Sequence, residues 1–474
     1  MNIKDDFILK NIHEGYLVGG MVRDFLLGKN SQDRDIAIKN AESFAKKIAS
    51  DLDATFIVLD SENKIFRVVL KDKENYLDIS ELQGKNIEED LLRRDFTINA
   101  IAYDLANDKF IDITGGIEDI KNKTLREIRE ENFTDDPLRI LRAYRFSSVT
   151  GFEPTDRLIE IIKKYISLVE KPAKERVHDE IMKLFGGKYC AQTLLKMLDD
   201  GILEIIFPCV KDMQKVPPNT HHHLDLIHHV IETVRQIELQ YEKSEGDIRE
   251  HLDKIDFGGY PRINHLKLAG FLHDIGKPST WTIEDSEGKC IWSISDGTDY
   301  PNNKKYRHRF IKHDLEGAKM VVPILKALKF SNKQIDYISD MIRNHIYPSS
   351  VISSPNLDKK VMMRYVRKMN DNVIDNILLA KADRLSAQGE AVTNEMTENN
   401  ISGLNKLLEF YIEVKPTLAP LPKLLDGNEI MKLLGISQSP LLGEIIKELY
   451  EAQLNQEVNT RDEAIEFVLK YNSK

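Results

Sequence analysis

Residues 16–38 read YLVGGMVRDFLLGKNSQDRDIAI, and this stretch decides the fold of the N-terminal region. A short apolar segment, Tyr16–Gly19, ends at a Gly-Gly pair and is typical of a strand that enters a tight turn. Met21–Leu27 has the apolar spacing of a helix, whereas Asp33–Ile38 alternates like a strand. Strand, helix and strand in so short a span predict a small α/β unit.

The pattern continues for about sixty residues and then changes. Ala41–Leu52 has helical spacing, and Thr55–Leu59, Lys64–Leu70 and Asn75–Ile79 are three further strand candidates between charged turns. From about Leu125 onwards the pattern is almost wholly helical. We therefore expect an α/β N-terminal head with a small mixed sheet, followed by mostly α-helical domains.

Length and composition limit the class of protein. The chain has 474 residues, of which 41% are hydrophobic and 30% charged, so it is expected to fold into several globular domains. Its net charge of −10 excludes a protein that grips nucleic acid by bulk positive charge. Any RNA contacts must therefore be concentrated in local basic patches.

The sequence as given shows no signal peptide, no membrane-spanning run and no paired cysteine spacing. The N-terminus carries acids and no apolar signal core, and no apolar run approaches membrane-spanning length. The three cysteines, Cys190, Cys209 and Cys290, lie far apart without paired spacing. We expect a cytoplasmic protein with no membrane partner.

Asp33 and Asp35 are the first candidate site. Side chains alternate along a strand, so these two carboxylates share one face, roughly 7 Å apart, while Arg34 points away. Such a pair can hold two divalent ions, and Mg²⁺, which prefers oxygen ligands, normally enters with phosphate attached. A bare Asp-x-Asp is more often an acidic strand end in solvent, so the flanking residues decide between the two interpretations.

The flanking turn suits a phosphate group. Gly19 and Gly20 stand directly before a helix, where backbone amides can approach an anion. Arg23 lies on the first turns of that helix. A Gly-Gly pair alone is usually only a tight turn.

Two later segments carry arginines beside hydrogen-bonding groups. In residues 93–100, RRDFTINA, guanidinium groups suit triphosphate oxygens, and carboxylate and amide groups suit ribose hydroxyls. In residues 136–145, DPLRILRAYR, an aspartate cap and arginines at spacing three lie near one helix face and can meet base edges. For residues 93–100 the alternative is a surface ion-pair cluster, and for residues 136–145 it is a capped helix with a basic outer stripe.

Taken in order, these motifs resemble the class II nucleotidyltransferases, which include bacterial CCA-adding enzymes and bacterial poly(A) polymerases. The resemblance rests on YLVGGMVRDFLLG and DRDIAI, RRDFTINAIAYD, DITGGIED at 112–119, DDPLRILRAYRF at 135–146, and Glu175-Arg176. It covers about 165 residues from the strand at Tyr16. The fourth motif begins Asp135-Asp136 where Glu-Asp is commoner in the family.

The resemblance implies a role for each matching residue. Two carboxylates would bind Mg²⁺ and carry the catalysis, a first group would contact triphosphate and ribose, and a second group would pair with the incoming base, so that the protein itself serves as template. These residues are, respectively, Asp33 and Asp35; Gly19, Gly20, Arg23, Arg94, Asp95 and Asn99; and Asp136 and Arg139 with support from Arg142. Asp78 matches a position that is often acidic in the family and is a candidate third carboxylate.

A second motif lies near the middle of the chain. Residues 271–277 read FLHDIGK and place His273 beside Asp274 at the end of an apolar helix, where both can reach one ion. Further candidates are His229 upstream and His313, His345 and Asp383 downstream. A lone histidine is usually a packing or surface residue. An adjacent His-Asp pair with three further histidines and a later aspartate instead favours a metal site.

The order of these residues resembles the HD phosphohydrolase superfamily over about residues 221–390. The resemblance implies that His229, His273, Asp274 and Asp383 ligate an unspecified divalent metal, which can activate a water against a phosphoester. His228 competes with its neighbour, and the match of residues 224–235, LDLIHHVIETVR, favours His229. Residues 278–309 interrupt the helices and are expected to form a hairpin, and Lys304–Arg309 is the densest basic patch nearby, more often a solvated loop than an RNA contact.

Together these resemblances imply four domains: a nucleotidyltransferase head over 1–122, a helical neck that contacts RNA and nucleobase over 123–215, an HD domain over 216–390, and a helical tail over 391–474 that binds tRNA. The implied function is addition of CCA to the 3′ end of tRNA from CTP and ATP. Thr55–Leu70 lacks the Gly-Arg-Arg-Phe type of segment associated with bacterial poly(A) polymerases, which favours tRNA.

Other functions stay open at this stage. A poly(A) polymerase and an enzyme that adds only CC or only A share the head motifs. An HD phosphohydrolase with a degenerate head is an alternative of another class, against which the intact Asp33–Asp35 pair counts. A non-catalytic RNA-binding scaffold is disfavoured by the negative charge and by the same two carboxylates.

Overall fold

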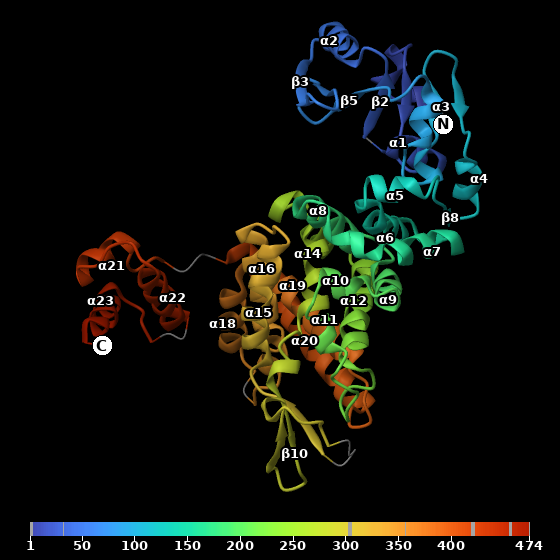
Figure 1. The fold of residues 1–474 in the computed structure, drawn as a ribbon. Helices are drawn as coiled ribbons and strands as arrows, with labels where there is room; N and C mark the ends of the chain where they lie inside the picture. The colour runs from blue at the N-terminus through green and yellow to red at the C-terminus, as the bar shows by residue number, and fades with distance from the viewer. Residues whose placement is uncertain are drawn as a thin grey trace. The chain divides into compact units, whose positions relative to one another are not determined.

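The computed structural model describes residues 3–31, 33–301, 306–355, 357–418, 422–454 and 457–473 (Figure 1). The chain divides into two compact units. The first unit is Met1–Pro208 with Ala327–Lys329, and the second is Cys209–Lys326 with Phe330–Lys474.

The first unit begins with a mixed seven-stranded sheet of order β3-β4-β5-β2-β1-β6-β7. Strand β2 pairs in parallel with β5 and antiparallel with β1, which confirms the expected small mixed sheet. The strands are β1 Tyr16–Val18, β2 Arg34–Ile38, β3 Thr55–Asp60, β4 Ile65–Val69, β5 Tyr76–Glu81, β6 Ala102–Asp104 and β7 Lys109–Ile111.

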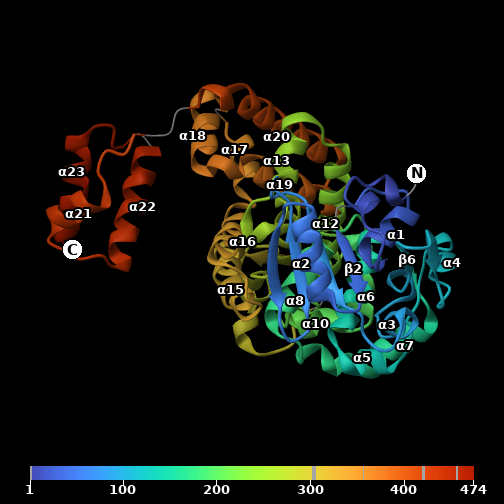
Figure 2. The ribbon, with the colours of Figure 1, turned by 90° about the horizontal axis from the view of Figure 1, so that it is seen from above.

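Helices on this sheet hold its central strands in place. Helix α2, Ala41–Asp51, packs across β2, β4 and β5 (Figure 2), and its buried face includes Phe44 and Ile48. The remaining helices of the head are α1 Gly20–Leu26, α3 Ile87–Leu92, the short 3₁₀ helix η3 Thr97–Asn99 and α4 Gly116–Lys121. Arg34 is turned away from its acidic neighbours, as expected, and is buried in an ion pair with Asp6 at 2.6 Å.

The rest of the first unit is helical, apart from the two-residue strands β8 Thr124–Leu125 and β9 Glu153–Pro154. Helices α6 and α8 pack against each other and carry cationic side chains toward the head. The helices are α5 Glu131–Asp135, α6 Leu138–Thr150, α7 Asp156–Tyr165, α8 Lys174–Phe185, α9 Cys190–Asp199 and α10 Ile202–Ile206.

The second unit is built around one helix that is buried on all sides. Every residue of α14, Arg262–Leu272, is buried, because α12, α16 and α19 surround it. The buried Arg262 pairs with the buried Asp375 at 2.9 Å, which compensates both charges. The other helices are α11 Val210–Met213, α12 Leu226–Lys243, α13 Gly246–Asp253, α15 His313–Ala327, α16 Asn332–Asn344, α17 Tyr347–Ile352, α18 Lys359–Met369, α19 Val373–Ser386 and α20 Asn394–Val414.

The interruption after α14 is a three-stranded antiparallel sheet of order β11-β10-β12, so it goes beyond the expected hairpin. Its strands are β10 Trp281–Glu284, β11 Cys290–Ser293 and β12 Arg307–Phe310. The third strand comes from beyond a long connection, which local periodicity does not reveal. Lys304 and Lys305 of the basic patch lie outside the described residues.

The C-terminal helices α21 Gly427–Leu434, α22 Pro440–Leu454 and α23 Arg461–Leu469 have a core of their own. Ile430, Ile445 and Val468 are fully buried within it. Among the helices of the described residues, none is long and apolar enough to cross a membrane.

Gly116 is the glycine of the head that a side chain would disturb most directly. A Cβ at this position would lie 2.1 Å from the Thr97 carbonyl oxygen, so α4 and η3 would have to separate. Overpacking of this kind costs about 1–3 kcal/mol. We expect Gly116→Ala to lower the Tm of the head by several degrees in a calorimetric scan. Gly443→Ala, in a helix with open space around it, is the control and should leave the scan unchanged or shift it upward. Equal effects of the two substitutions would contradict the close approach.

Candidate functional site

The eleven residues of the head and neck singled out in the sequence all line one cavity of ≈ 590 Å³. They are Gly19, Gly20, Arg23, Asp33, Asp35, Arg94, Asp95, Asn99, Asp136, Arg139 and Arg142. The lining also contains Arg93, Arg145, Phe146 and Arg176, which belong to the quoted motifs but were given no individual role, and Gln83, Asp90 and Lys183, which the sequence did not single out. Eight cationic and five acidic side chains meet here in a chain of net charge −10. The cavity is therefore a local basic patch of the kind that RNA or nucleotide binding requires.

Three carboxylates lie close together on β2 and β5 and on the residue before β2, and two of them, Asp33 and Asp35, line the cavity. Ligand atoms of Asp33, Asp35 and Asp78 all lie within 4.8 Å of one another, since β2 places Asp35 directly beside Asp78 of β5. Arg67 holds both Asp78 oxygens at 2.7 Å, so the described structure leaves Asp33 and Asp35 as the available pair. Gly19 makes room for them, because a Cβ there would lie 3.3 Å from an Asp35 oxygen.

The surroundings of Asp35 disfavour the ionised form of its carboxyl group. Burial, Asp33 and Asp78 raise the pKa of its carboxyl group to about 7, although Arg94 and Arg67 act in the opposite direction. A divalent cation between Asp33 and Asp35 would relieve this repulsion and release the proton. The donor set, two or three carboxylate oxygens, fits a hard divalent ion such as Mg²⁺.

One wall of the cavity is a hydrogen-bonded network centred on Asp95. Its oxygens accept from the Asn99 amide at 2.9 Å, from the Phe96 backbone amide at 2.8 Å and from Arg142 at 2.8 Å. Burial favours the neutral carboxyl, but Arg142 and the Asn99 amide hold the pKa of Asp95 below its ordinary value. Asn99 in turn accepts from Arg23 at 2.8 Å, so Asp95 orients the groups around it.

Asp136 and Arg139 lie at the start of α6. Asp136 accepts from the Leu138 backbone amide at 3.3 Å and from both terminal nitrogens of Arg176 at 3.2 and 2.8 Å. The N-cap of α6 is Pro137, one residue after the Asp136 cap that the sequence predicted. Arg139 donates to the backbone carbonyl of Arg93 at 2.7 Å. Both side chains are thus held by protein partners. The engagement of Asp136 by Arg176, forty residues away, was not visible in the sequence.

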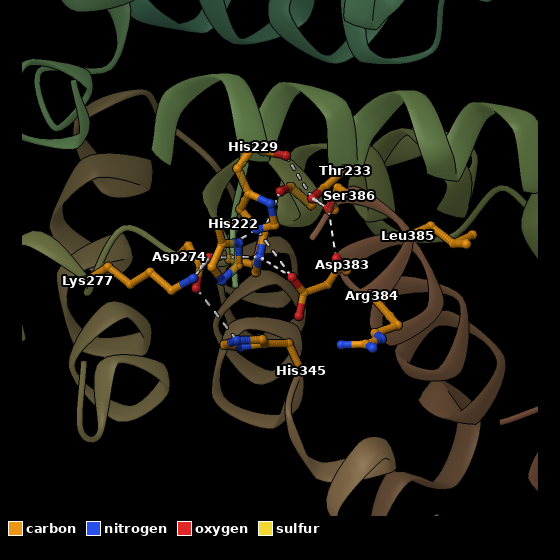
Figure 3. Close-up of polar contacts among 12 residues, drawn as sticks. His222, His229, Thr233, Asp274, Lys277, His345, Asp383, Arg384, Leu385 and Ser386 are labelled. Atoms are coloured by element: carbon orange, nitrogen blue, oxygen red, sulfur yellow. Dashed lines mark hydrogen bonds and ion pairs between the residues drawn. The ribbon is translucent and has the colours of Figure 1, made fainter. Parts of the chain in front are cut away.

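The second cluster lies within the second unit (Figure 3). His229 comes from α12, His273 and Asp274 follow α14, and Asp383 comes from α19. The Nε2 atom of His229 lies 3.3 Å from Asp274 Oδ2 and 3.2 Å from Asp383 Oδ1, and His273 Nε2 lies 3.2 Å from the same Asp274 oxygen. The four predicted ligands therefore converge on one point. The competing His228 is half exposed and pairs with Asp225 on the surface.

The buried atoms of this cluster fit a cation. His229 Nε2, His273 Nε2 and both Asp274 oxygens are buried and make no regular hydrogen bond within the described structure, and Asp274 Oδ2 forms an ion pair with Lys277 at 2.5 Å. Buried polar atoms without partners are costly, whereas four nitrogen and oxygen donors around one point can satisfy a divalent ion. Without such an ion, burial opposes protonation of His273, but Asp274 and Asp383 raise its pKa to about 10.

His313 and His345 form a second set with the other Asp274 oxygen. Their Nε2 atoms lie 3.1 and 3.7 Å from Asp274 Oδ1 and 3.2 Å from each other. Their Nδ1 atoms donate to the carbonyls of Phe310 and Ile342, which leaves a lone pair on each Nε2. Two such lone pairs repel unless a proton or cation lies between them. The arrangement can hold two cations bridged by Asp274, where the sequence predicted one.

Comparisons with known proteins find likenesses over the regions that carry both clusters. Residues 15–126 match the model of the poly(A) polymerase head domain, residues 151–214 match a probable RNA- and SrmB-binding site of polymerase A, and residues 226–388 match the HD domain. The chain is 29% identical over 460 residues to an A-adding tRNA nucleotidyltransferase of Deinococcus radiodurans, across 96% of this chain and 95% of the relative. It is 28% identical over 471 residues to a CC-adding tRNA nucleotidyltransferase of Thermus thermophilus, across 98% and 95% of the two chains.

A solved structure has the same fold. A CCA-adding enzyme of Thermotoga maritima complexed with tRNA superposes with a TM-score of 0.53 at 21% identity, over 96% of this chain and 90% of that one.

The pKa of Asp35 predicts a pH-dependent effect on stability. Because the folded protein holds the Asp35 proton more tightly than the unfolded chain does, ionisation of Asp35 destabilises the fold progressively as pH rises from about 4 to about 7. We expect Asp35→Asn, without added metal, to raise the Tm by several degrees at pH 8 and by less at pH 5. Excess Mg²⁺ should reverse the order at pH 8, since only the wild type gains from binding. The exposed Glu42→Gln is the control, and equal shifts at both pH values would refute the assignment.

The bridging position of Asp274 predicts metal stoichiometry. In an Asp33→Asn background that weakens the head site, titration with Mn²⁺ should reveal two tight sites in the HD cluster. We expect His345→Ala to lose one of them and Asp274→Asn to lose both, while the surface variant His228→Ala keeps both. Retention of two ions by Asp274→Asn, measured calorimetrically and by electron paramagnetic resonance, would exclude the bridged arrangement.

Proposed function

We propose that the chain is a nucleotidyltransferase of the class II family, with a poly(A) polymerase-type head and an HD domain, and that it builds CCA onto the 3′ end of tRNA from CTP and ATP. The observation that supports this proposal most directly is the single cavity that contains Asp33, Asp35, Asp136 and Arg139 together with eight cationic side chains. A triphosphate, a ribose and a base can be held there at once.

Divalent cations are used by both the head and the HD domain of this family, and we infer that the head takes Mg²⁺ on Asp33 and Asp35. Asp33 and Asp35 would hold the ions, which would supply Lewis-acid stabilisation of the attacking 3′-oxygen and of the leaving pyrophosphate. Asp35 must be ionised for this, and because its surroundings raise its pKa to about 7, metal binding has to displace a proton from it below that pH.

Arg23 and Arg94 are placed to bind the triphosphate, and Asn99 the ribose. Arg23 lies on the helix that follows the Gly19-Gly20 turn, and Arg94 lies beside Gly19. Asp95 acts through its neighbours, because its hydrogen bonds hold Asn99 and Arg142 in position. A bound triphosphate would compete with Asp90 for the guanidinium of Arg94, which pairs with that carboxylate at 3.0 Å.

Selection of the base follows from the chemistry of Asp136 and Arg139. Cytosine and adenine each present an amino donor beside a ring-nitrogen acceptor, which matches a carboxylate beside a guanidinium. Guanine and uracil present a carbonyl acceptor beside a ring N–H donor, so they oppose the same pair. Asp136 must leave Arg176 and Arg139 must leave the Arg93 carbonyl before either can read a base.

We infer a second activity, phosphoester hydrolysis, at the HD cluster. Its buried donors fit divalent ions, which would supply an activated water. In the balanced reaction the water oxygen bonds to phosphorus, the ester P–O bond breaks, and the leaving alcohol takes a proton. Lys277, 2.5 Å from Asp274, is positioned to contact the phosphate.

The decisive experiment uses tRNA that lacks its last three nucleotides, with Mg²⁺ and CTP, ATP or both, and reads product length on a sequencing gel. Three added nucleotides that require both substrates are expected. Asp35→Ala should lower the rate at least about a thousandfold, since a metal carboxylate is lost, and the exposed control Glu42→Ala should retain full activity.

The product length also separates the related functions. Addition that stops after CC, or addition of A only to a CC end, would identify a partial enzyme, as the names of the two whole-length relatives illustrate. Long A tails would identify a poly(A) polymerase. Failure to extend any end, with hydrolysis retained by Asp35→Ala, would favour an HD phosphohydrolase with a degenerate head.

A further inference from the structure

One buried aromatic ring forms part of the wall of the head cavity. Phe146, on α6, lines the cavity although only 2% of its surface is exposed. The fourth motif contains this residue, but the sequence assigned it no role of its own. Its ring meets that of Phe96 at 80°, with 5.6 Å between the ring centroids. Packing against a second buried ring therefore fixes the position of Phe146.

Three guanidinium groups lie over this ring. The Cζ atoms of Arg145, Arg23 and Arg142 are 3.8, 5.2 and 5.4 Å from its centroid. All three arginines also line the cavity, and Arg23 comes from α1 whereas the other two come from α6. A cation within about 6 Å of a ring centroid is attracted by the negative charge of the ring face. The Phe146 ring is thus a shared support for cations from two separate elements.

Buried carboxylates hold two of these arginines from other directions. Arg145 pairs with Glu180 at 2.7 Å, and Arg142 pairs with Asp95 at 2.6 Å. Both carboxylates are buried. Cations gathered this closely repel one another, and the two carboxylates together with the ring face offset that repulsion. The guanidinium groups are therefore confined before any ligand arrives.

Confinement of this kind favours the binding of an anion. An arginine that is mobile in the free protein loses rotamer freedom when it binds a ligand, and this loss lowers the affinity. A guanidinium group can keep its face on an aromatic ring while its edge donates hydrogen bonds to phosphate oxygens. Contact with the ring therefore does not compete with contact to a polyphosphate.

We propose that Phe146 is a positioning residue, whose ring holds Arg23, Arg142 and Arg145 in place for the incoming nucleotide and so sets the affinity of the cavity for its polyphosphate chain. The inference rests on the proposed function, because it takes the ligand of the cavity to be a nucleoside triphosphate. The alternative is that the ring only fills space in the core. The charge of the ring face matters in the first case, and only the shape of the ring matters in the second.

Fluorination separates the charge of the ring face from the shape of the ring. Mono-, di- and trifluorinated phenylalanine, inserted at position 146 alone in the full-length chain, weaken the negative face stepwise and change the size of the ring little. The probe is inorganic tripolyphosphate, titrated calorimetrically into protein that also carries Asp274→Asn, so that the HD cluster does not provide a second phosphate site. We expect the affinity to fall with each fluorine, by about 5- to 50-fold in total. A constant affinity across the series, or no binding of tripolyphosphate by the unfluorinated protein, would overturn the proposal.

Phe133 provides the matched control. Its ring is equally buried and packs against Phe96 at 6.1 Å, and no cation of the described residues lies over it. The same fluorinated residues at position 133 should leave the affinity for tripolyphosphate unchanged. An equal loss at the two positions would show that fluorine perturbs the core in general, and would refute a role for the cations over Phe146.

Nucleotide addition to tRNA gives a second readout. In the series at position 146 we expect the KM for CTP and for ATP to rise by a similar factor and kcat to change less, because a positioning role acts on binding. A fall in kcat at constant KM would contradict this role. If the unsubstituted protein extends no tRNA end, the proposed function fails, whereas the dependence of tripolyphosphate binding on fluorine still decides the role of Phe146.

Discussion

Repulsion between carboxylates on adjacent strands is the constraint on which the head depends. The register of β2 against β5 sets Asp35 beside Asp78, and Asp33 lies at the same edge. The surrounding structure offsets this repulsion in part. Arg67 neutralises Asp78, and the absence of a side chain at Gly19 keeps the space before Asp35 open. A divalent ion between Asp33 and Asp35 would supply the remaining compensation, and we propose that it enters together with a triphosphate.

The HD cluster also contains a carboxylate whose negative charge must be compensated, and here that carboxylate is buried. Asp274 lies in the interior, and burial and the neighbouring imidazoles and Lys277 act on it in opposite directions, with the pKa of its carboxyl group held well below the ordinary value. The imidazoles are fixed through their Nδ1 atoms, as in His273, which donates to the Gly270 carbonyl at 2.8 Å. A fully buried α14 delivers His273 and Asp274 from a rigid element. Precise placement of ligands on rigid helices is what a metal site requires.

Local sequence was informative wherever the chemistry lies within one short motif. The alternation of Asp33 and Asp35, the Gly19 turn and the arginines of α6 were each predicted from neighbours within ten residues, and the structure brings them into one cavity. The fold of residues 278–309 was harder to predict from the sequence. Its strand β12 joins β10 across more than twenty residues, part of which lies outside the described structure, and periodicity gave only a hairpin.

The sequence by itself determined the class of fold, the order of the motifs and the ligands that stand on one strand or one helix end, because side-chain direction there follows from backbone period. Only the tertiary structure decided which distant groups complete each site: Arg176 on Asp136, Arg67 on Asp78, and His313 with His345 on the free oxygen of Asp274. These partners are chosen by packing between separate elements. Packing depends on the whole core, whereas periodicity reports only which face of an element is turned inward.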